Sequence, residues 1–325
     1  DEGEARARVM FYAAQPDQLP QRDVFLGTGG SVYFLERQDI LSGTAVISAQ
    51  IRDPDTGRII ETQLLQPGVD YHINYIQGIV TLARPLSSTV DSGLVISGND
   101  PDLVLVAQYE YTPTVGDVDG YAFGGRGEIW ATDQVRFGVT GMVDQSGVAD
   151  HKAVGVDVMW RRNEDTYVTA EYARTDGPGF ANTYSSDGGL VFDTATAAVG
   201  QGEAVKIDAR VGLTDLGLSA DGSISAYFEH RTEGFSSIDH QVLATTGAET
   251  LWGFHADIKP SEKLRYTIYG DSYENDAGEI DRSIGAEVEV AINDRLDLTL
   301  GVESVDIDDS TDVGTRTDIA ARLDY

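Results

Sequence analysis

Residues 281–305 read DRSIGAEVEVAINDRLDLTLGVESV, and their pattern indicates the fold class. Apolar side chains at Ile284, Val288 and Ile292 share one parity, whereas Glu287 and Glu289 have the other. A period of two is that of a β-strand whose two faces meet different surroundings. The runs 281–292 and 295–305 are longer than the roughly five or six residues of strands in soluble sheets. The stretch therefore predicts a hairpin of two long strands.

Twelve runs of this kind follow one another from residue 103 to the end of the chain. They cover 103–112, 120–131, 134–144, 152–162, 165–175, 203–214, 222–232, 249–259, 263–273, 281–292, 295–305 and 315–325. The connections between them are alternately short and long, as in outer-membrane barrels, which have tight periplasmic turns and longer external loops. The sequence predicts an all-β protein with an antiparallel transmembrane β-barrel of about 12 strands.

The part of the chain before this set is expected to fold separately. Residues 1–25 show no sustained period and predict an extended lead-in, and residues 26–100 predict a small periplasmic β domain, sandwich-like and built from hairpins. The turn residues Asp53–Gly57 and Gln77-Gly78 each separate two strand-like runs. The outer-membrane β-barrel is then expected over 101–325.

Composition excludes several classes of protein. The net charge is −31, with 23 Lys and Arg against 54 Asp and Glu, so binding of a nucleic-acid backbone is not expected. Cysteine is absent, which excludes disulfides and thiolate metal sites. The mean hydropathy is −0.22, and no window of eighteen apolar residues predicts a spanning helix.

Charged side chains of both signs fall on the polar parity of the predicted strands and are expected to line the lumen. These are Arg126, Glu128, Arg136, Asp157, Arg161, Glu171, Lys206, Asp208, Arg210, Glu229, Arg231, Asp257, Arg265, Asp271, Glu287, Glu289, Asp297, Glu303, Asp318 and Arg322. Trp130 has the same parity as Arg126, so alternation also turns it inward. One interpretation is a channel whose acidic excess favours cations. The other is a paired network that fills and stiffens a narrow barrel.

No catalytic, cofactor or metal site is predicted. Two acidic loops offer oxygen ligands of the kind that Ca²⁺ prefers, but neither has the spacing of a known calcium loop. Their carboxylates are Asp306, Asp308, Asp309 and Asp312 in one loop and Asp276, Glu279 and Asp281 in the other. Solvated acidic loops are the favoured interpretation, and Ca²⁺ is a secondary one. A hydrolase would need His230 or His240 beside a serine such as Ser236 or Ser237, and the sequence gives no further sign of one. The protein is therefore not expected to be an enzyme.

Three segments carry a resemblance to a known group of proteins. They are GTGGSVYFLERQDILSG (27–43), IRDPDTGRIIETQLLQPGVDYHINYIQGIVTLARPLSS (51–88) and LVAQYEYTP (105–113). They resemble a β module of large proteobacterial outer-membrane surface proteins, in which it directly precedes a C-terminal β-barrel. The phrase VDYHINYIQG (69–78) is also similar to phrases in the giant translocon of the type 9 secretion system. The resemblance covers about a quarter of the chain and implies no catalytic residue.

Two functions remain open from the sequence. The first is an integral outer-membrane protein that forms a porin-like pore or anchors a surface or envelope assembly, with its N-terminal domain in the periplasm. Its expected partners are outer-membrane lipid, including lipopolysaccharide, and other envelope or surface proteins. The second is a soluble structural or adhesive β-domain protein of a surface array.

Overall fold

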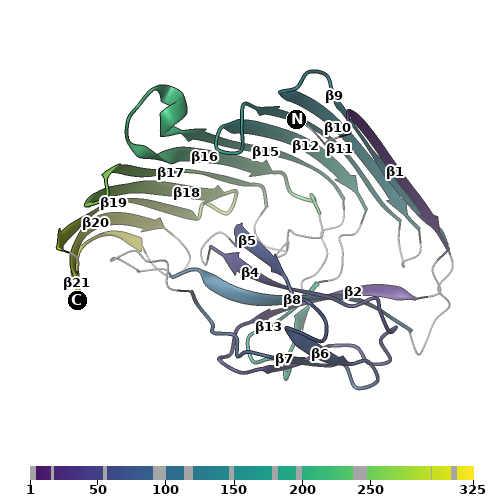
Figure 1. Cartoon of the computed structure of the whole chain (residues 1–325). Coiled ribbons are helices and arrows are strands. Elements are labelled where there is room, and N and C mark those ends of the chain that lie inside the picture. The colour runs from purple at the N-terminus through teal and green to yellow at the C-terminus, as the bar shows by residue number, and fades with distance from the viewer. Residues whose placement is uncertain are drawn as a thin grey trace.

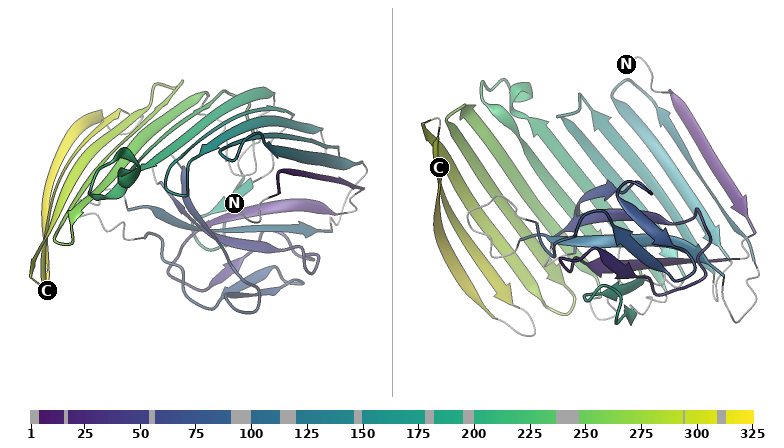
Figure 2. Two further views of the ribbon diagram at one scale, coloured as in Figure 1. Left: turned by 45° about the horizontal axis from the view of Figure 1, so that its top comes forward. Right: turned by 60° about the horizontal axis from the view of Figure 1, so that its bottom comes forward.

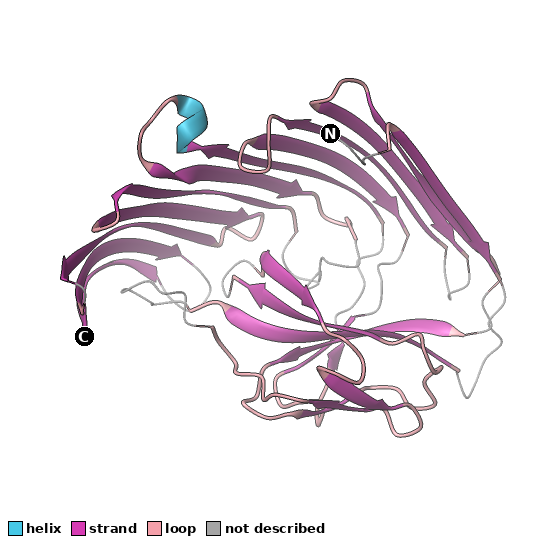
Figure 3. Cartoon of the chain, viewed as in Figure 1, coloured by secondary structure: helices cyan, strands magenta, loops and turns pink. Residues whose placement is uncertain are grey.

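The structure, a computed structural model, is all-β. It describes residues 5–15, 18–53, 57–90, 100–112, 120–145, 150–177, 182–194, 200–236, 247–293, 295–308 and 313–325. Within these ranges the single helical element is the 3₁₀ turn η1 (Leu213–Leu216), so strands and their connections make up the fold (Figure 3). No helix in the described part of the chain has the length and apolar character needed to cross a membrane.

Twelve antiparallel strands form one large curved sheet (Figure 1). In spatial order they are β1 (Ala7–Ala14), β9 (Ala122–Trp130), β10 (Val135–Asp144), β11 (His151–Arg161), β12 (Tyr167–Asp176), β15 (Gln201–Gly212), β16 (Asp221–Arg231), β17 (Glu249–Ser261), β18 (Leu264–Asn275), β19 (Ile280–Asn293), β20 (Leu296–Asp308) and β21 (Val313–Asp324). An antiparallel sheet of twelve strands is therefore present, and eleven of them are runs expected from the sequence. In the described residues no pairing joins β1 to β21, and the sheet is an open trough (Figure 2).

The prediction of an extended lead-in over residues 1–25 is wrong for β1. This strand pairs antiparallel with β9, from Ala7 opposite Ile129 to Ala14 opposite Ala122. A run of eight residues is too short to establish a period by itself, and its partner lies more than a hundred residues away. Only tertiary pairing identifies it as the first strand of the sheet.

The run 103–112 is a strand, β8 (Asp102–Tyr111), but it does not belong to the large sheet. It pairs with β2 (Leu19–Leu26) and β4 (Val46–Arg52) in a separate sheet. Its central residues are buried, as in a strand covered on both faces. The large sheet still has twelve strands because β1 takes the place of this one. Since β8 belongs to the small domain, the predicted domain boundary at residue 101 lies too early in the chain.

The small domain consists of two further sheets. The larger has the order β14 (Asp193–Thr194), β13 (Asn182–Ser185), β2, β8, β4 and β5 (Ile59–Leu64), and the smaller has the order β3 (Val32–Phe34), β7 (Ile79–Leu82) and β6 (Tyr71–Asn74). Both predicted strand pairs, β4–β5 and β6–β7, are confirmed, and Gly78 in the second turn has a φ of 67°. Residues 54–56 of the first predicted turn lie outside the described residues. β13 comes from the connection between β12 and β15 and pairs parallel with β2, so the domain is not confined to residues 26–100.

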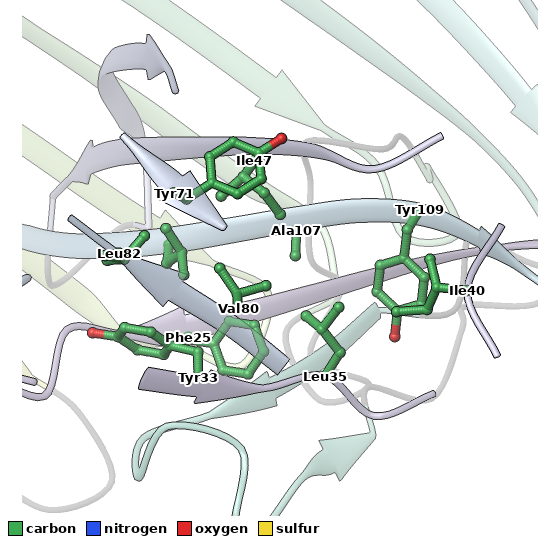
Figure 4. Packing of buried hydrophobic residues seen from close by; sticks show 11 residues of the cluster. Phe25, Tyr33, Leu35, Ile40, Ile47, Tyr71, Val80, Leu82, Ala107 and Tyr109 are labelled. Carbon is green, nitrogen blue, oxygen red and sulfur yellow. The ribbon is translucent and has the colours of Figure 1, made fainter. Parts of the chain in front are cut away.

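An apolar core holds the two small sheets together (Figure 4). Phe25, Tyr33, Ile47 and Leu105 are fully buried in it. The rings of Phe25 and Tyr33 meet edge to face with their centroids 5.5 Å apart, a favoured aromatic arrangement. The core belongs to the small domain alone, so this domain has its own source of stability.

The buried carboxylate of Asp23 links distant segments of the chain to the small domain by hydrogen bonds. Asp23 has no exposed surface and accepts hydrogen bonds from Tyr109 Oη (2.7 Å) and Thr183 Oγ1 (2.6 Å). Burial, and after it the nearby negative charge of Asp23, raises the pKa of Tyr109 well above its usual range. The phenol therefore stays protonated and keeps donating. Thr183 lies on β13, so this network fixes the β12–β15 connection to the small domain.

The small domain lies on the concave side of the large sheet (Figures 1 and 2). The chain enters it after Ala14 of β1 and leaves it before Ala122 of β9, and these two residues are register partners. The domain is therefore inserted into the first connection of the large sheet. That connection is at the same end of the sheet as the β12–β15 connection, which the small domain also binds.

Phe25→Ala is expected to destabilise the small domain by about 3–5 kcal/mol, because it leaves a cavity between the two small sheets. Hydrogen–deuterium exchange of β2 and β8 in the full chain measures the effect. The control is Ile76→Ala, at a side chain that is 75% exposed in the same domain. Equal exchange in the two variants would show that Phe25 does not hold the sheets together.

Candidate functional site

All twenty side chains predicted to line a lumen lie on one face of the large sheet. Directly paired residues of antiparallel strands point to the same side. Asp157 pairs with Glu171, Glu171 with Lys206, and Lys206 with Glu229, so one row of charges crosses four strands. The pairing of the other strands keeps the remaining predicted residues, from Arg126 on β9 to Arg322 on β21, on the same face. This is the concave face, which the small domain contacts.

The convex face has the opposite character. Its large exposed side chains form what we call the apolar belt: Val139, Val156, Ile207, Phe228, Trp252, Ile268, Ile284, Leu300, Val302, Ile319 and Leu323. Charged residues of this parity occur within the described strands only near the ends that carry the long connections. They are Lys152, Arg174, Asp176, Glu203, Glu274, Arg282, Asp306 and Asp308. The convex face is thus mainly apolar, and the concave face is rich in charged side chains.

The first ion-pair cluster on the concave face spans β9 to β11. Arg126 Nη1 lies 2.8 Å from Asp157 Oδ2, and Arg136 Nη1 lies 3.8 Å from Glu128 Oε2. Gly138 leaves room for this cluster, since a Cβ there would lie 2.1 Å from Asp157 Oδ2. The cluster consists of two arginines and two carboxylates, so it has the paired-network character.

Trp130 lies on this face, as alternation predicted. The Arg161 guanidinium carbon is 4.9 Å from the centroid of its indole ring. Such a cation–π contact is favourable and gives the inward tryptophan a role in packing the charged face.

The second cluster is centred on Glu229, which is only 3% exposed. Lys206 Nζ lies 3.3 Å from Glu229 Oε1, and Arg231 Nη1 lies 2.7 Å from Glu249 Oε1. Arg231 also pairs with Glu229. A carboxylate so well buried requires several partners, because an uncompensated charge there is strongly unfavourable.

Arg58 brings the small domain into this second cluster. Its side chain comes from the turn end of the β4–β5 hairpin, just before β5, and lies 3.6 Å from Glu229 Oε1 and 3.9 Å from Asp208 Oδ1. The guanidinium carbon is also 3.6 Å from the centroid of the Tyr227 ring. These atoms lie near the middle of β15 and β16, so the hairpin reaches the centre of the concave face.

Sequence reasoning missed Arg58 and Tyr227. Arg58 follows an ordinary hairpin turn, and Tyr227 is one of 15 tyrosines on the chain. Nothing in the local pattern distinguishes them, since their meeting depends on where the inserted domain docks.

The part of the concave face on β18 to β21 is less balanced. Of the predicted set it holds six acidic and two basic side chains, and we call it the acidic half: Asp271, Glu287, Glu289, Asp297, Glu303 and Asp318, with Arg265 and Arg322. Glu303 is buried and accepts a hydrogen bond from Tyr269 Oη at 3.2 Å. Arg265 pairs with Asp257 of the neighbouring strand. This excess of carboxylates attracts cations.

The other candidate residues do not assemble into a site in the described part of the chain. There, no group of three or more His, Asp or Glu side chains is arranged to hold a metal ion. Asp306 Oδ1 accepts a hydrogen bond from Thr315 at 3.1 Å, whereas Asp309 and Asp312 lie outside the described residues. His230 Nδ1 lies 2.9 Å from Thr250 Oγ1. His240 and Ser237 also lie outside the described residues.

Comparison with known proteins adds no assignment. No protein-family model matches the chain, and no curated protein matches it significantly. The opposite character of the two faces of the large sheet, together with the docked hairpin, is therefore the basis for a function.

Arg58→Glu is expected to detach the hairpin, because it places a carboxylate against Asp208 and Glu229 and removes the cation over Tyr227. The loss is about 1–3 kcal/mol, which corresponds to roughly 5- to 150-fold acceleration of exchange. Hydrogen–deuterium exchange of β5 measures it. Arg84→Glu makes the same charge change at an exposed site of the small domain. If β5 exchanges equally fast in both variants, Arg58 does not hold the hairpin.

Proposed function

We propose that the chain is a bacterial outer-membrane β-barrel whose lumen is filled by its own inserted domain. In this state it serves as the membrane anchor of an envelope or surface assembly. The single observation that carries the proposal is the apolar belt on the convex face, which lies opposite a face lined with charges.

The dimensions of the belt suit a bilayer. On β19 the belt parity runs from Ile284 to Ile292, a length of about 27 Å at the usual rise of a strand. With a tilt of about 40° the height becomes about 20 Å, near the roughly 25 Å apolar band of outer-membrane barrels. Ile319 and Leu323 are 83% and 62% exposed, so in water the belt would be an unusually large apolar patch.

Closure of the sheet belongs to the same proposal. Because the number of strands is even and every pair is antiparallel, the first and last strands also run antiparallel to each other. Their free backbone groups have no water partners inside a bilayer, and pairing β1 with β21 satisfies them. A closed barrel of about 12 strands is the expected state in the membrane.

The orientation of the small domain follows from its insertion point. Short turns lie at one end of the large sheet, and the small domain enters through the other end, beside Ala14 and Ala122. If the longer connections are external, the domain fills the lumen from the outer side. This replaces the periplasmic location expected from sequence. The ends of β1 and β21 farthest from the domain, at Ala7 and Asp324, are then periplasmic.

A second function, a cation-favouring pore, is supported by the acidic half of the concave face. Its carboxylates are not matched by equal numbers of basic residues in the predicted set. Rings of Asp and Glu favour cations in channels. Pore and anchor share the barrel and differ in whether the inserted domain leaves, or can open, a continuous path.

The full chain, refolded into phospholipid vesicles, is expected to float with them and to migrate faster on gels before heating than after. A closed barrel resists unfolding by detergent until it is heated. The measurement is vesicle flotation followed by a gel of heated and unheated samples. A chain that stays monodisperse without detergent and does not float is a soluble β protein, and the membrane proposal falls.

Ile319→Arg is expected to reduce insertion into vesicles, whereas Ala320→Arg is not. The two residues are adjacent on β21 but pair with Val302 of the belt and with Gly301 of the concave face, respectively. An arginine facing lipid costs roughly 2–4 kcal/mol at mid-depth and less near the bilayer surfaces. Flotation yields of the two variants provide the comparison. Equal yields would show that the convex face does not meet lipid.

The pore function predicts that, in a planar bilayer, the wild-type protein conducts weakly and Arg58→Glu conducts more, with preference for K⁺ over Cl⁻. The reason is that the hairpin of the small domain leaves the charged face. Arg84→Glu again serves as the control. Inserted protein that remains silent in every variant supports the anchor and overturns the pore.

A further inference from the structure

A trench crosses the convex face near the ends of β1, β9, β10, β11 and β12 that carry the long connections. Its volume is about 610 Å³, within the usual range of roughly 300–1,000 Å³ for small-molecule sites. Phe11, Phe123, Gly141, Val154, Lys152 and Arg174 are among its lining residues. Most of the surface inside it is apolar.

Two rows of convex-face residues form the walls. In one row Phe11 is opposite Gly125, which pairs with Gly141, then Val154 and Arg174 follow. In the other row Phe123 pairs with Val143, which is followed by Lys152 and Asp176. The residues between the rows turn their side chains to the concave face, so backbone forms the floor. The glycines deepen the trench because they add no side chain to its wall.

The two ends of the trench differ in chemistry. At the β1–β9 end the rings of Phe11 and Phe123 stand on either wall. At the β11–β12 end two cations, Lys152 and Arg174, occupy opposite walls. Arg174 also pairs with Glu203 at 3.7 Å and donates to Gln201 Oε1 at 2.6 Å, and Asp176 pairs in register with Lys152. Arg174 and Glu203 are each about half exposed, so this pair is weak and its cation remains accessible to a ligand.

We propose that the trench binds one lipid molecule that carries a phosphate headgroup. An acyl chain lies over the glycines between Phe11 and Phe123, and the phosphate lies between Lys152 and Arg174. The inference rests on the proposed function, since it takes the convex face to be the lipid-facing one. It adds a particular site and a ligand class to a surface that otherwise contacts lipid without selection.

The apolar end and the cationic end of the trench match the acyl chain and the phosphate headgroup of a lipid. Burying an acyl chain against apolar walls is favourable for each CH₂ group that leaves water. In a bilayer the neighbouring lipids offer similar surroundings, so selection must come from the headgroup. Arginine and lysine form charge-assisted hydrogen bonds with phosphate oxygens, which are about twice as strong as neutral ones.

The trench can be filled without disturbing the backbone. A Cβ on Gly141 would meet only Ala153 O, at 4.0 Å, so Gly141→Leu places a side chain in open space within the trench. Gly127→Leu is the matched control. Its Cβ would meet only Val139 Cγ1, at 3.8 Å, and Gly127 is on the same convex face but outside the trench.

The charge can be tested separately. The double variant Lys152→Ala with Arg174→Ala removes both cations from the end of the trench. Arg282→Ala removes a cation from the same rim of the convex face on β19, where it pairs with Glu274 at 3.6 Å. The probes are phosphatidylglycerol and diacylglycerol with the same acyl chains, which differ in the headgroup phosphate.

Native mass spectrometry of the detergent-solubilised full chain measures how many molecules of each probe remain bound and how tightly. Wild type, Gly127→Leu and Arg282→Ala are expected to retain one phosphatidylglycerol in preference to diacylglycerol. Gly141→Leu and the double alanine variant are expected to bind it about tenfold more weakly, the effect of losing one strong interaction.

Vesicle flotation of the same samples distinguishes failure of the lipid site from failure of the membrane-barrel proposal. Protein that floats but binds both probes equally, or that loses phosphatidylglycerol equally in test and control variants, overturns the lipid site and leaves the membrane barrel intact. Protein that does not float overturns both. Protein that floats and loses the lipid only in the trench variants supports both.

Discussion

The large sheet has two different faces because the two-residue period of its strands stays in register from each strand to the next. A slip of one residue in any pair would exchange the faces of every strand beyond it. The register does not slip in this sense: charges from Arg126 to Arg322 stay on one face, and apolar side chains from Val139 to Leu323 stay on the other. Irregularities occur at the ends of two pairings, near Ser261 and Asn293, beside short turns.

The inserted domain supplies a charged partner to the concave face. Charged side chains that the small domain covers on this face need partners, because desolvation of an unpaired charge is costly. The strands supply many of these partners among themselves, as at Asp157 and Glu229. Arg58 of the small domain supplies another partner from outside the sheet. The same ion pair therefore compensates a charge on the concave face and binds the small domain to it. Asp23 plays the complementary role inside the domain, where it holds Thr183 of the β12–β15 connection.

The distribution of charge is uneven in a way that bears on function. The face formed by β9 to β11 contains matched pairs, as expected of a structural network. The acidic half on β18 to β21 contains more carboxylates than cations in the predicted set. The two interpretations left open by the sequence, a paired network and a cation-attracting lining, therefore apply to different parts of one surface. The functional question becomes whether the small domain leaves the acidic half accessible.

The amino-acid sequence was enough to predict the long antiparallel strands and the face on which each side chain lies, because alternation is a local property of the extended backbone. It also determined the hairpins around Asp53 and Gly78, since turn residues act over a few positions. Tertiary structure alone decided that residues 7–14 begin the large sheet, that β8 belongs to the small domain, and that Arg58 meets Glu229. These three outcomes depend on pairings between residues far apart in the chain. Several strand edges are equally suitable partners, so only the packing of the whole structure selects the pairing that forms.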